Sequence, residues 1–195
     1  YAAEIRKVRP AGPWFLCGHS FGAWVGFETA RILAADTPGA AHLLVLDMVA
    51  PVLDLPLEAE DRTDADWVAE LAGVIGRMTG AQLDLPLENL RALDTQGMIA
   101  LLAKQLNAAQ RELPGFGEKQ LRGFLNVFKA NQRMRYRVEQ AGPTDVTVFR
   151  AADGGGGNAA RGDGAAAAWA DLKQAPDMGW QRVSKRPVTV RRAPG

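Results

Sequence analysis

The chain has 195 residues and a formal net charge of +1, and 47% of its residues are apolar and 23% charged. These values are ordinary for a globular protein, so they exclude a largely disordered chain and predict a single domain. The arginines are scattered rather than gathered into a basic stripe with interleaved aromatic residues. A nucleic-acid partner is therefore not expected.

Cysteine content and hydropathy narrow the class of protein further. Cys17 is the single cysteine, which excludes an internal disulfide and any multi-cysteine metal site. The most apolar stretch, residues 43–55, contains Asp47, Pro51 and Asp54 and is too short to span a membrane. No signal peptide opens the sequence. We therefore expect a cytoplasmic protein with no bound metal and no membrane partner.

A strand, a helix and a second strand are predicted near the start of the chain. Residues 14–19 form an apolar run typical of a buried parallel strand, and residues 21–35 have the composition of an amphipathic helix. Residues 42–47 form another apolar run that ends in a carboxylate. This order predicts a βαβ unit, and hence an α/β fold with a mostly parallel sheet.

The hydrophobic period becomes helical between about residues 54 and 142. One apolar helical face is formed by Trp67, Leu71, Val74, Ile75 and Met78. Two more amphipathic helices are predicted around residues 98–106 and 121–128, and strand character returns at residues 145–150 and 187–191. We predict one domain with a core of residues 1–53 and 143–195 and a helical insertion in between.

The motif Gly18-His19-Ser20-Phe21-Gly22 lies between the first predicted strand and the helix. In this context Gly-x-Ser-x-Gly is typical of a nucleophile elbow, in which a tight turn exposes the serine hydroxyl. We expect Gly18 and Gly22 to make the turn sterically possible. We also expect the Phe21 N–H, at the helix N-terminus, to stabilise an oxyanion.

A serine nucleophile needs a base, and that base needs an orienting carboxylate. Only two histidines exist, His19 and His42. His19 adjoins the serine, where its ring should point away from the hydroxyl. His42 begins the second strand, at the end opposite the elbow, roughly 15 Å from Ser20 at about 3.3 Å per residue. Neither is expected to act as the base.

Two aspartates are candidates for the orienting acid. Asp47 ends the strand that follows the elbow helix, at the edge where open α/β sheets assemble their sites. Asp153 follows the later strand and could reach the same position, so it is the alternative acid. Either could instead cap a turn.

The remaining chemically notable residues are expected to be structural. Cys17 lies on the predicted buried strand and should only pack. Residues 153–164 are rich in glycine but lack the lysine of a phosphate-binding loop, so they indicate a connection. Four aromatic residues could line an acyl channel, although aromatic residues at helical spacing are more often core. These are Trp67, Phe116, Phe124 and Phe128.

Three stretches together resemble the thioesterase domains of nonribosomal peptide and polyketide synthases, members of the α/β-hydrolase superfamily. They are residues 18–23, residues 44–47 followed by Pro51, and Gly179-Trp180. The resemblance implies that Ser20 and Asp47 belong to one catalytic triad, which favours Asp47 over Asp153. It also implies that residues 54 to about 142 form a helical lid over the acyl site.

The resemblance also implies segments beyond the two ends of the sequence. The chain begins with Tyr1 rather than Met and ends in the loop-like Ala193-Pro194-Gly195, so we expect a piece of a longer protein. The triad histidine is expected shortly after Gly195, and the first strands and the second oxyanion donor before Tyr1. On its own the segment should then be inactive.

The implied substrate is an acyl or peptidyl thioester on the phosphopantetheine arm of a carrier protein, and no cofactor is bound directly. Attack by Ser20 would give an acyl-serine intermediate, which water or a group of the bound chain would release as an acid, a lactone or a lactam. A stand-alone editing thioesterase or a general esterase is the first alternative. A non-catalytic binding module with a hydrolase fold is the second.

Overall fold

The computed structural model describes residues 1–35, 40–53, 62–109, 117–151 and 165–193. The chain divides into two compact units, residues 1–55 with 135–195 and residues 56–134. The single-domain interpretation and the exact limits of the insertion stay predictions. Among the described residues, no helix is long and apolar enough to cross a membrane.

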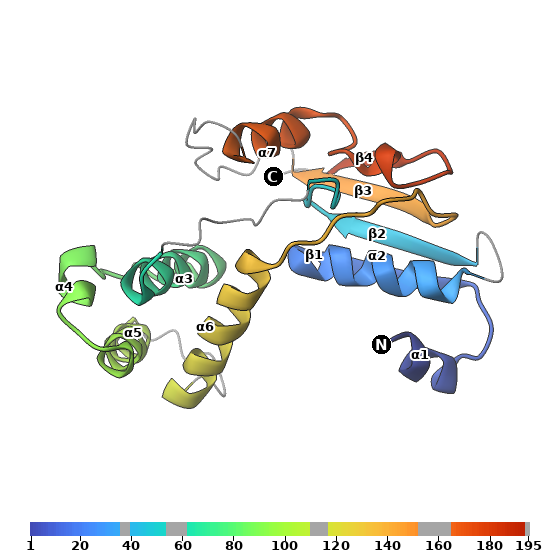
Figure 1. Ribbon diagram of the computed structural model, residues 1–195. Helices are drawn as coiled ribbons and strands as arrows, with labels where there is room; N and C mark the ends of the chain where they lie inside the picture. The colour runs from blue at the N-terminus through green and yellow to red at the C-terminus, as the bar shows by residue number, and fades with distance from the viewer. Residues whose placement is uncertain (36–39, 54–61, 110–116, 152–164, 194–195) are drawn as a thin grey trace. The chain divides into compact units, whose positions relative to one another are not determined.

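A four-stranded parallel sheet forms the centre of the first unit (Figure 1), with its strands in the order of the chain. The strands are β1 (Trp14–His19), β2 (Ala41–Leu46), β3 (Asp145–Ala151) and β4 (Thr189–Ala193). All four lie within about two residues of their predicted positions. The chain leaves this sheet after β2 and returns to it at β3, so the neighbouring strands β2 and β3 are far apart in sequence.

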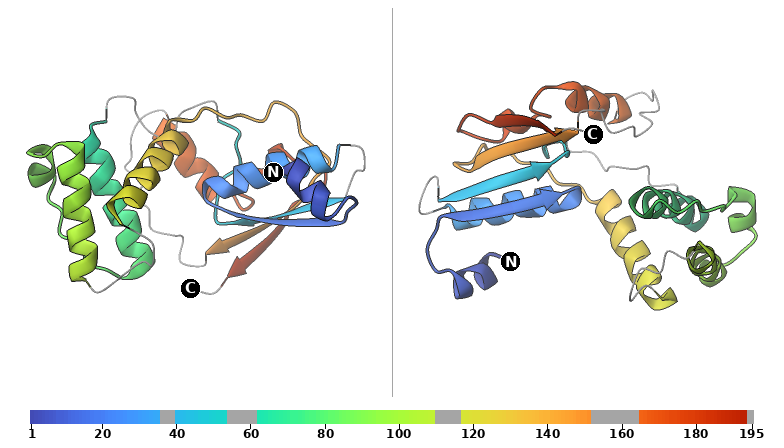
Figure 2. Two further views of the ribbon diagram at one scale, coloured as in Figure 1. Left: turned by 90° about the horizontal axis from the view of Figure 1, so that it is seen from below. Right: turned by 180° about the vertical axis from the view of Figure 1, so that it is seen from behind.

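Helices of the first unit pack on one face of its sheet (Figure 2). These helices are α1 (Ala2–Val8), α2 (Phe21–Leu33) and α7 (Ala165–Gln174). Leu43 and Val45 of β2, Val146 and Val148 of β3 and Phe27 of α2 are at most 1% exposed and form the core on this face. The α2 helix was predicted from its amphipathic composition, whereas α1 and α7 were not predicted.

The opposite face of the sheet carries alternate side chains that remain accessible in this structure. Phe15 is 69% exposed and Leu46 37% exposed. Cys17 is exposed on this same face, so the prediction that it is a buried packing residue is wrong. The prediction failed because an apolar run cannot reveal whether one or both faces of a strand are covered.

The second unit is a cluster of helices, α3 (Asp64–Thr79), α4 (Leu87–Arg91), α5 (Thr95–Ala108) and α6 (Glu118–Arg133). Thr63 and Asp66 form a reciprocal capping box at the start of α3, and the Asp94 side chain accepts a hydrogen bond from Gly97 at the start of α5. Both caps fix helix starts that hydrophobic period alone does not specify.

The core of the second unit contains most of the predicted apolar positions. Trp67, Leu71 and Ile75 of α3 are at most 2% exposed and pack with Leu102 of α5 and Leu121 of α6. Phe124 and Phe128 pack against this cluster as partly buried residues. Met78 is 75% exposed, so its placement on the buried face of α3 was wrong. Phe116 lies outside the described residues.

Candidate active site

Ser20 occupies a sharp turn between β1 and α2. Its φ of 53° and ψ of −135° lie where L-residues are rarely found, and it is the N-cap residue of α2. Its carbonyl accepts the first hydrogen bond of the helix, from Ala23 N–H at 2.9 Å. A strained backbone at one exposed serine, held between a strand and a helix, is the geometry of a nucleophile elbow.

The two glycines of the motif differ in what they do. A Cβ on Gly18 would lie 2.4 Å from the carbonyl oxygen of Gly22 and 2.5 Å from Cα of Ala23, so β1 and α2 approach too closely for a side chain. A Cβ on Gly22 would meet nothing within 4 Å. The expected steric role holds for Gly18, and it is wrong for Gly22 because the motif does not show which side of the turn faces open space.

The first residue of α2 is Phe21. The first amides of an α-helix have no intrahelical acceptor, and the helix dipole is positive at that end. The Phe21 N–H therefore lies beside Ser20 with the chemistry required of an oxyanion donor. Its role as a donor stays a prediction.

Asp47 follows the last residue of β2 and also has a left-handed backbone, with φ of 46°. Its N–H donates to the Phe149 carbonyl at 2.8 Å, and its Oδ1 accepts from the Ala151 N–H at 3.3 Å. The side chain is half-buried. These contacts fix the carboxylate to β3. The sequence carries no signal for them, because any residue can supply a backbone amide.

Strand register brings the serine and this aspartate to the same edge of the sheet. The last residue of β1, His19, pairs with the last residue of β2, Leu46. Ser20 and Asp47 are the next residues on two neighbouring parallel strands, which run about 4.8 Å apart. The carboxyl edge of a parallel sheet is where open α/β proteins place their sites.

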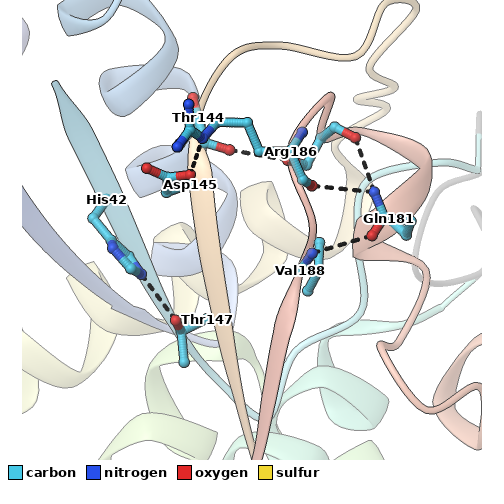
Figure 3. Close-up of polar contacts among 8 residues, drawn as sticks. His42, Thr144, Asp145, Thr147, Gln181, Arg186 and Val188 are labelled. Atoms are coloured by element: carbon cyan, nitrogen blue, oxygen red, sulfur yellow. Dashed lines mark hydrogen bonds and ion pairs between the residues drawn. The ribbon is translucent and has the colours of Figure 1, made fainter. Parts of the chain in front are cut away.

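His42 lies away from this arrangement, whereas His19 directly precedes Ser20 in the chain. His42 is the second residue of β2, near the opposite edge of the sheet, where its ring stacks on Phe15 with centroids 6.0 Å apart. Its Nε2 is 2.8 Å from Thr147 Oγ1 (Figure 3). His19 is exposed and ends β1, on the face of the sheet that also carries Phe15.

Two further sequence predictions concern the same region. Asp153, the alternative acid, lies outside the described residues. Among the residues that are described, no group of three or more histidine, cysteine, aspartate or glutamate side chains could hold a metal ion. The candidate site, as far as it is described, combines Ser20, Asp47 and nearby backbone amides.

This fold and this strand edge define an α/β-hydrolase-type protein. The chain matches the Thioesterase domain family over residues 1–195, and it belongs to that family. The resemblance predicted from the elbow, the β2 terminus and Gly179-Trp180 is thereby confirmed.

The relatives are long biosynthetic synthases. Chondramide synthase of Chondromyces crocatus is 27% identical over 205 residues, which cover 98% of this chain and 5% of that protein. A non-reducing polyketide synthase of Hypomyces subiculosus is 39% identical over 61 residues, 31% of this chain and 3% of that protein. The chain thus spans a small part of the curated relatives it matches.

Solved structures show the same fold. A four-domain nonribosomal peptide synthetase bound to AMP and glycine aligns with a TM-score of 0.74 at 23% identity, covering 100% of this chain and 14% of that one. The Vlm2 thioesterase domain aligns with a TM-score of 0.58 at 22% identity, covering 100% of this chain and 64% of that one. The chain is therefore a domain of the Thioesterase family with an α/β-hydrolase-like fold.

Proposed function

We propose that this chain contributes the nucleophile and the acid of a thioesterase that releases an acyl or peptidyl chain from a carrier protein. The observation that carries the proposal is that Ser20 and Asp47 directly follow His19 and Leu46, the paired last residues of two adjacent strands. The substrate is a thioester on the phosphopantetheine arm of the carrier. The multidomain nature of the relatives supports a carrier domain as partner.

Catalysis begins when Ser20 Oγ attacks the thioester carbonyl while a base removes the hydroxyl proton. The Phe21 N–H stabilises the oxyanion of the tetrahedral intermediate. The carbon–sulfur bond then breaks, the proton passes from the base to the departing thiolate, and an acyl-serine ester remains. Water, or a hydroxyl or amine of the bound chain, attacks this ester and returns the proton to Ser20.

The base in this proposal is a histidine outside residues 1–195. His42 is hydrogen-bonded to Thr147 and lies four residues before Leu46, the last residue of β2, and His19 is the residue next to the serine. Asp47 orients the histidine and stabilises its charged form. Asp153 remains the alternative to Asp47 as the acid. The cytoplasmic location of the protein also stays a prediction.

Two measurements on the full-length native protein test this function. A fluorophosphonate probe should label Ser20, as shown by peptide mass mapping, and Ser20→Ala should remove the label. Hydrolysis of an octanoyl thioester should then be compared between a carrier-bound phosphopantetheine and free N-acetylcysteamine. A higher kcat/KM on the carrier supports the carrier-linked enzyme, and equal values favour a general esterase.

Two rival functions make other predictions. A stand-alone editing thioesterase shows the same labelling and carrier preference but occurs in a protein without an adjoining carrier domain. A non-catalytic binding module leaves both the probe and the thioester unreacted. Full thioesterase activity in Ser20→Ala would contradict the proposed nucleophile.

A further inference from the structure

Two tryptophan side chains hold the backbone that follows Asp47. The indole Nε1–H of Trp180 donates to the Met48 carbonyl at 2.7 Å, and that of Trp24 donates to the Val49 carbonyl at 2.9 Å. These are consecutive carbonyls, one and two residues beyond the aspartate. They are fixed by side chains that come from two distant parts of the chain.

The first of these side chains comes from the elbow helix itself. Trp24 lies one turn after Ser20 in α2 and is only 3% exposed. Its ring lies against those of Trp169, Tyr136 and Phe21, with centroids 6.1, 6.0 and 6.2 Å away. Because the ring is packed from several sides, its N–H direction is fixed. Trp24 thus connects α2, the helix that follows Ser20, to the loop that follows Asp47.

The second side chain comes from the short 3-10 helix η1 (Trp180–Arg182). Gly179 precedes it with φ of 83°, and the Asp177 carboxylate accepts from the N–H groups of Gly179 and Gln181. Trp180 is fully buried and packs edge-on against Phe27 of α2, with centroids 5.6 Å apart. The left-handed backbone of Gly179 therefore lets the chain turn so that this indole reaches the Met48 carbonyl in the loop after β2.

The aspartate between these contacts has a conformation that would not persist without support. A non-glycine residue with φ of 46° is in a strained conformation, and surrounding contacts must hold it there. Its own N–H and Oδ1 are bound to β3, as described above. The following backbone is bound by the two indoles, and the Ala50 N–H donates to the Met178 carbonyl at 2.9 Å. These contacts together hold Asp47 and the three residues that follow it.

We propose that Trp24 and Trp180 are positioning residues, which hold the Asp47 carboxylate in line with the catalytic histidine through the Met48 and Val49 carbonyls. This inference rests on the proposed function of Asp47. Misplacing a catalytic group by about 1 Å can lower a rate roughly 100-fold, so loss of one indole hydrogen bond should slow the chemistry rather than binding.

The test uses Trp24→Phe and Trp180→Phe in the full-length native protein, since phenylalanine keeps most of the ring and removes the N–H. Trp14→Phe is the matched control, because Trp14 is also buried, at 8% exposed, and its indole Nε1–H donates to the Arg9 carbonyl at 3.1 Å. Trp14 is the first residue of β1, at the end of the strand opposite Ser20. Two constants are measured for each variant as a fluorophosphonate reacts with Ser20. The first is kinact, the rate at saturating fluorophosphonate, and the second is KI, the fluorophosphonate concentration that gives half of this rate. Each substitution is repeated in an Asp47→Asn background.

Trp24→Phe and Trp180→Phe should lower kinact about tenfold or more with KI within about twofold, and Trp14→Phe should leave kinact within about twofold. In the Asp47→Asn background, the two substitutions should have no further effect, because they act through the carboxylate. A purely structural role would give the same loss in both backgrounds, and that result overturns the inference alone. Failure of the wild-type Ser20 to react, or full reactivity of Asp47→Asn, overturns the proposed function and the inference with it.

Discussion

Ser20 directly follows His19 and Asp47 directly follows Leu46, and His19 and Leu46 are partners at the ends of the adjacent strands β1 and β2. Ser20 and Asp47 both have a positive φ. Two positive φ values at non-glycine residues on neighbouring strand ends are uncommon and mark functional sites. The candidate nucleophile and the candidate acid therefore share one edge.

The choice between the two acids can be tested directly. Asp47→Asn should lower the rate of acyl transfer by about 10³- to 10⁴-fold, because an amide cannot hold the catalytic histidine in the required tautomer. Asp153→Asn should change it less than about twofold. Hydrolysis of octanoyl-N-acetylcysteamine by the full-length protein measures both. The reverse ranking would assign the acid to Asp153.

The two glycines of the elbow should respond oppositely to the same substitution. Gly18→Ala places a methyl group against the backbone of Gly22 and Ala23, so it should destabilise by about 1–3 kcal/mol or more. Gly22→Ala meets open space within α2 and should stabilise by roughly 0.5–1 kcal/mol. Denaturant unfolding of the two variants measures the difference. Equal destabilisation would show that the turn is not packed as described.

Asp64 of the second unit should make stability depend on pH. Its carboxylate accepts from Lys129 Nζ and from Thr95 Oγ1, both at 2.6 Å, and these bonds lower the pKa of Asp64 below 3.8. Because the folded pKa is below the unfolded one, the stabilisation is present above pH 3.8 and is lost as pH falls through the folded pKa.

The pH dependence is measured with Asp64→Asn. This variant should unfold more easily than wild type at pH 7, and the difference should shrink as pH falls through and below 3.8. The measurement is the denaturant midpoint across that range. A difference that is constant with pH would mean that the charge of Asp64 contributes nothing.

Arg150 should anchor the C-terminal end of α7. Its guanidinium donates to the carbonyls of Lys173 at 2.7 Å, Ala175 at 2.9 Å and Pro176 at 3.3 Å, and these groups lie at the negative end of the helix dipole. Arg150→Lys keeps the charge but cannot span these acceptors, so we expect a loss of about 1–3 kcal/mol.

Hydrogen exchange of peptides from residues 165–176 gives the local readout for Arg150→Lys. Their amides should exchange faster than in wild type, while those of β1 should be unchanged. Arg31→Lys is a matched control, since Arg31 pairs with Glu28 one turn away on an exposed helix surface. Equal exchange in wild type and Arg150→Lys would show that α7 is held by its apolar face alone.

Much of the fold and the candidate site could be predicted from the sequence because the signals are local. The apolar runs of β1 and β2, the helical spacing of α3 and α6 and the position of Ser20 between strand and helix need no information from distant residues. The short α1 and α4 were missed because they are only 7 and 5 residues long, and neither completes two helical turns.

What only the tertiary structure decided is which surfaces are covered and which distant groups meet. Exposure of Cys17 depends on whether a second layer covers its face of the sheet. Three hydrogen bonds join residues that are 25 to 132 positions apart in the sequence: that of Asp47 with Ala151, and those of the two indoles with the Met48 and Val49 carbonyls. Backbone amides and carbonyls are common to every residue, so no sequence pattern marks them. Sequence alone thus determined the elbow and its helix, whereas long-range packing determined how the aspartate is held beside it.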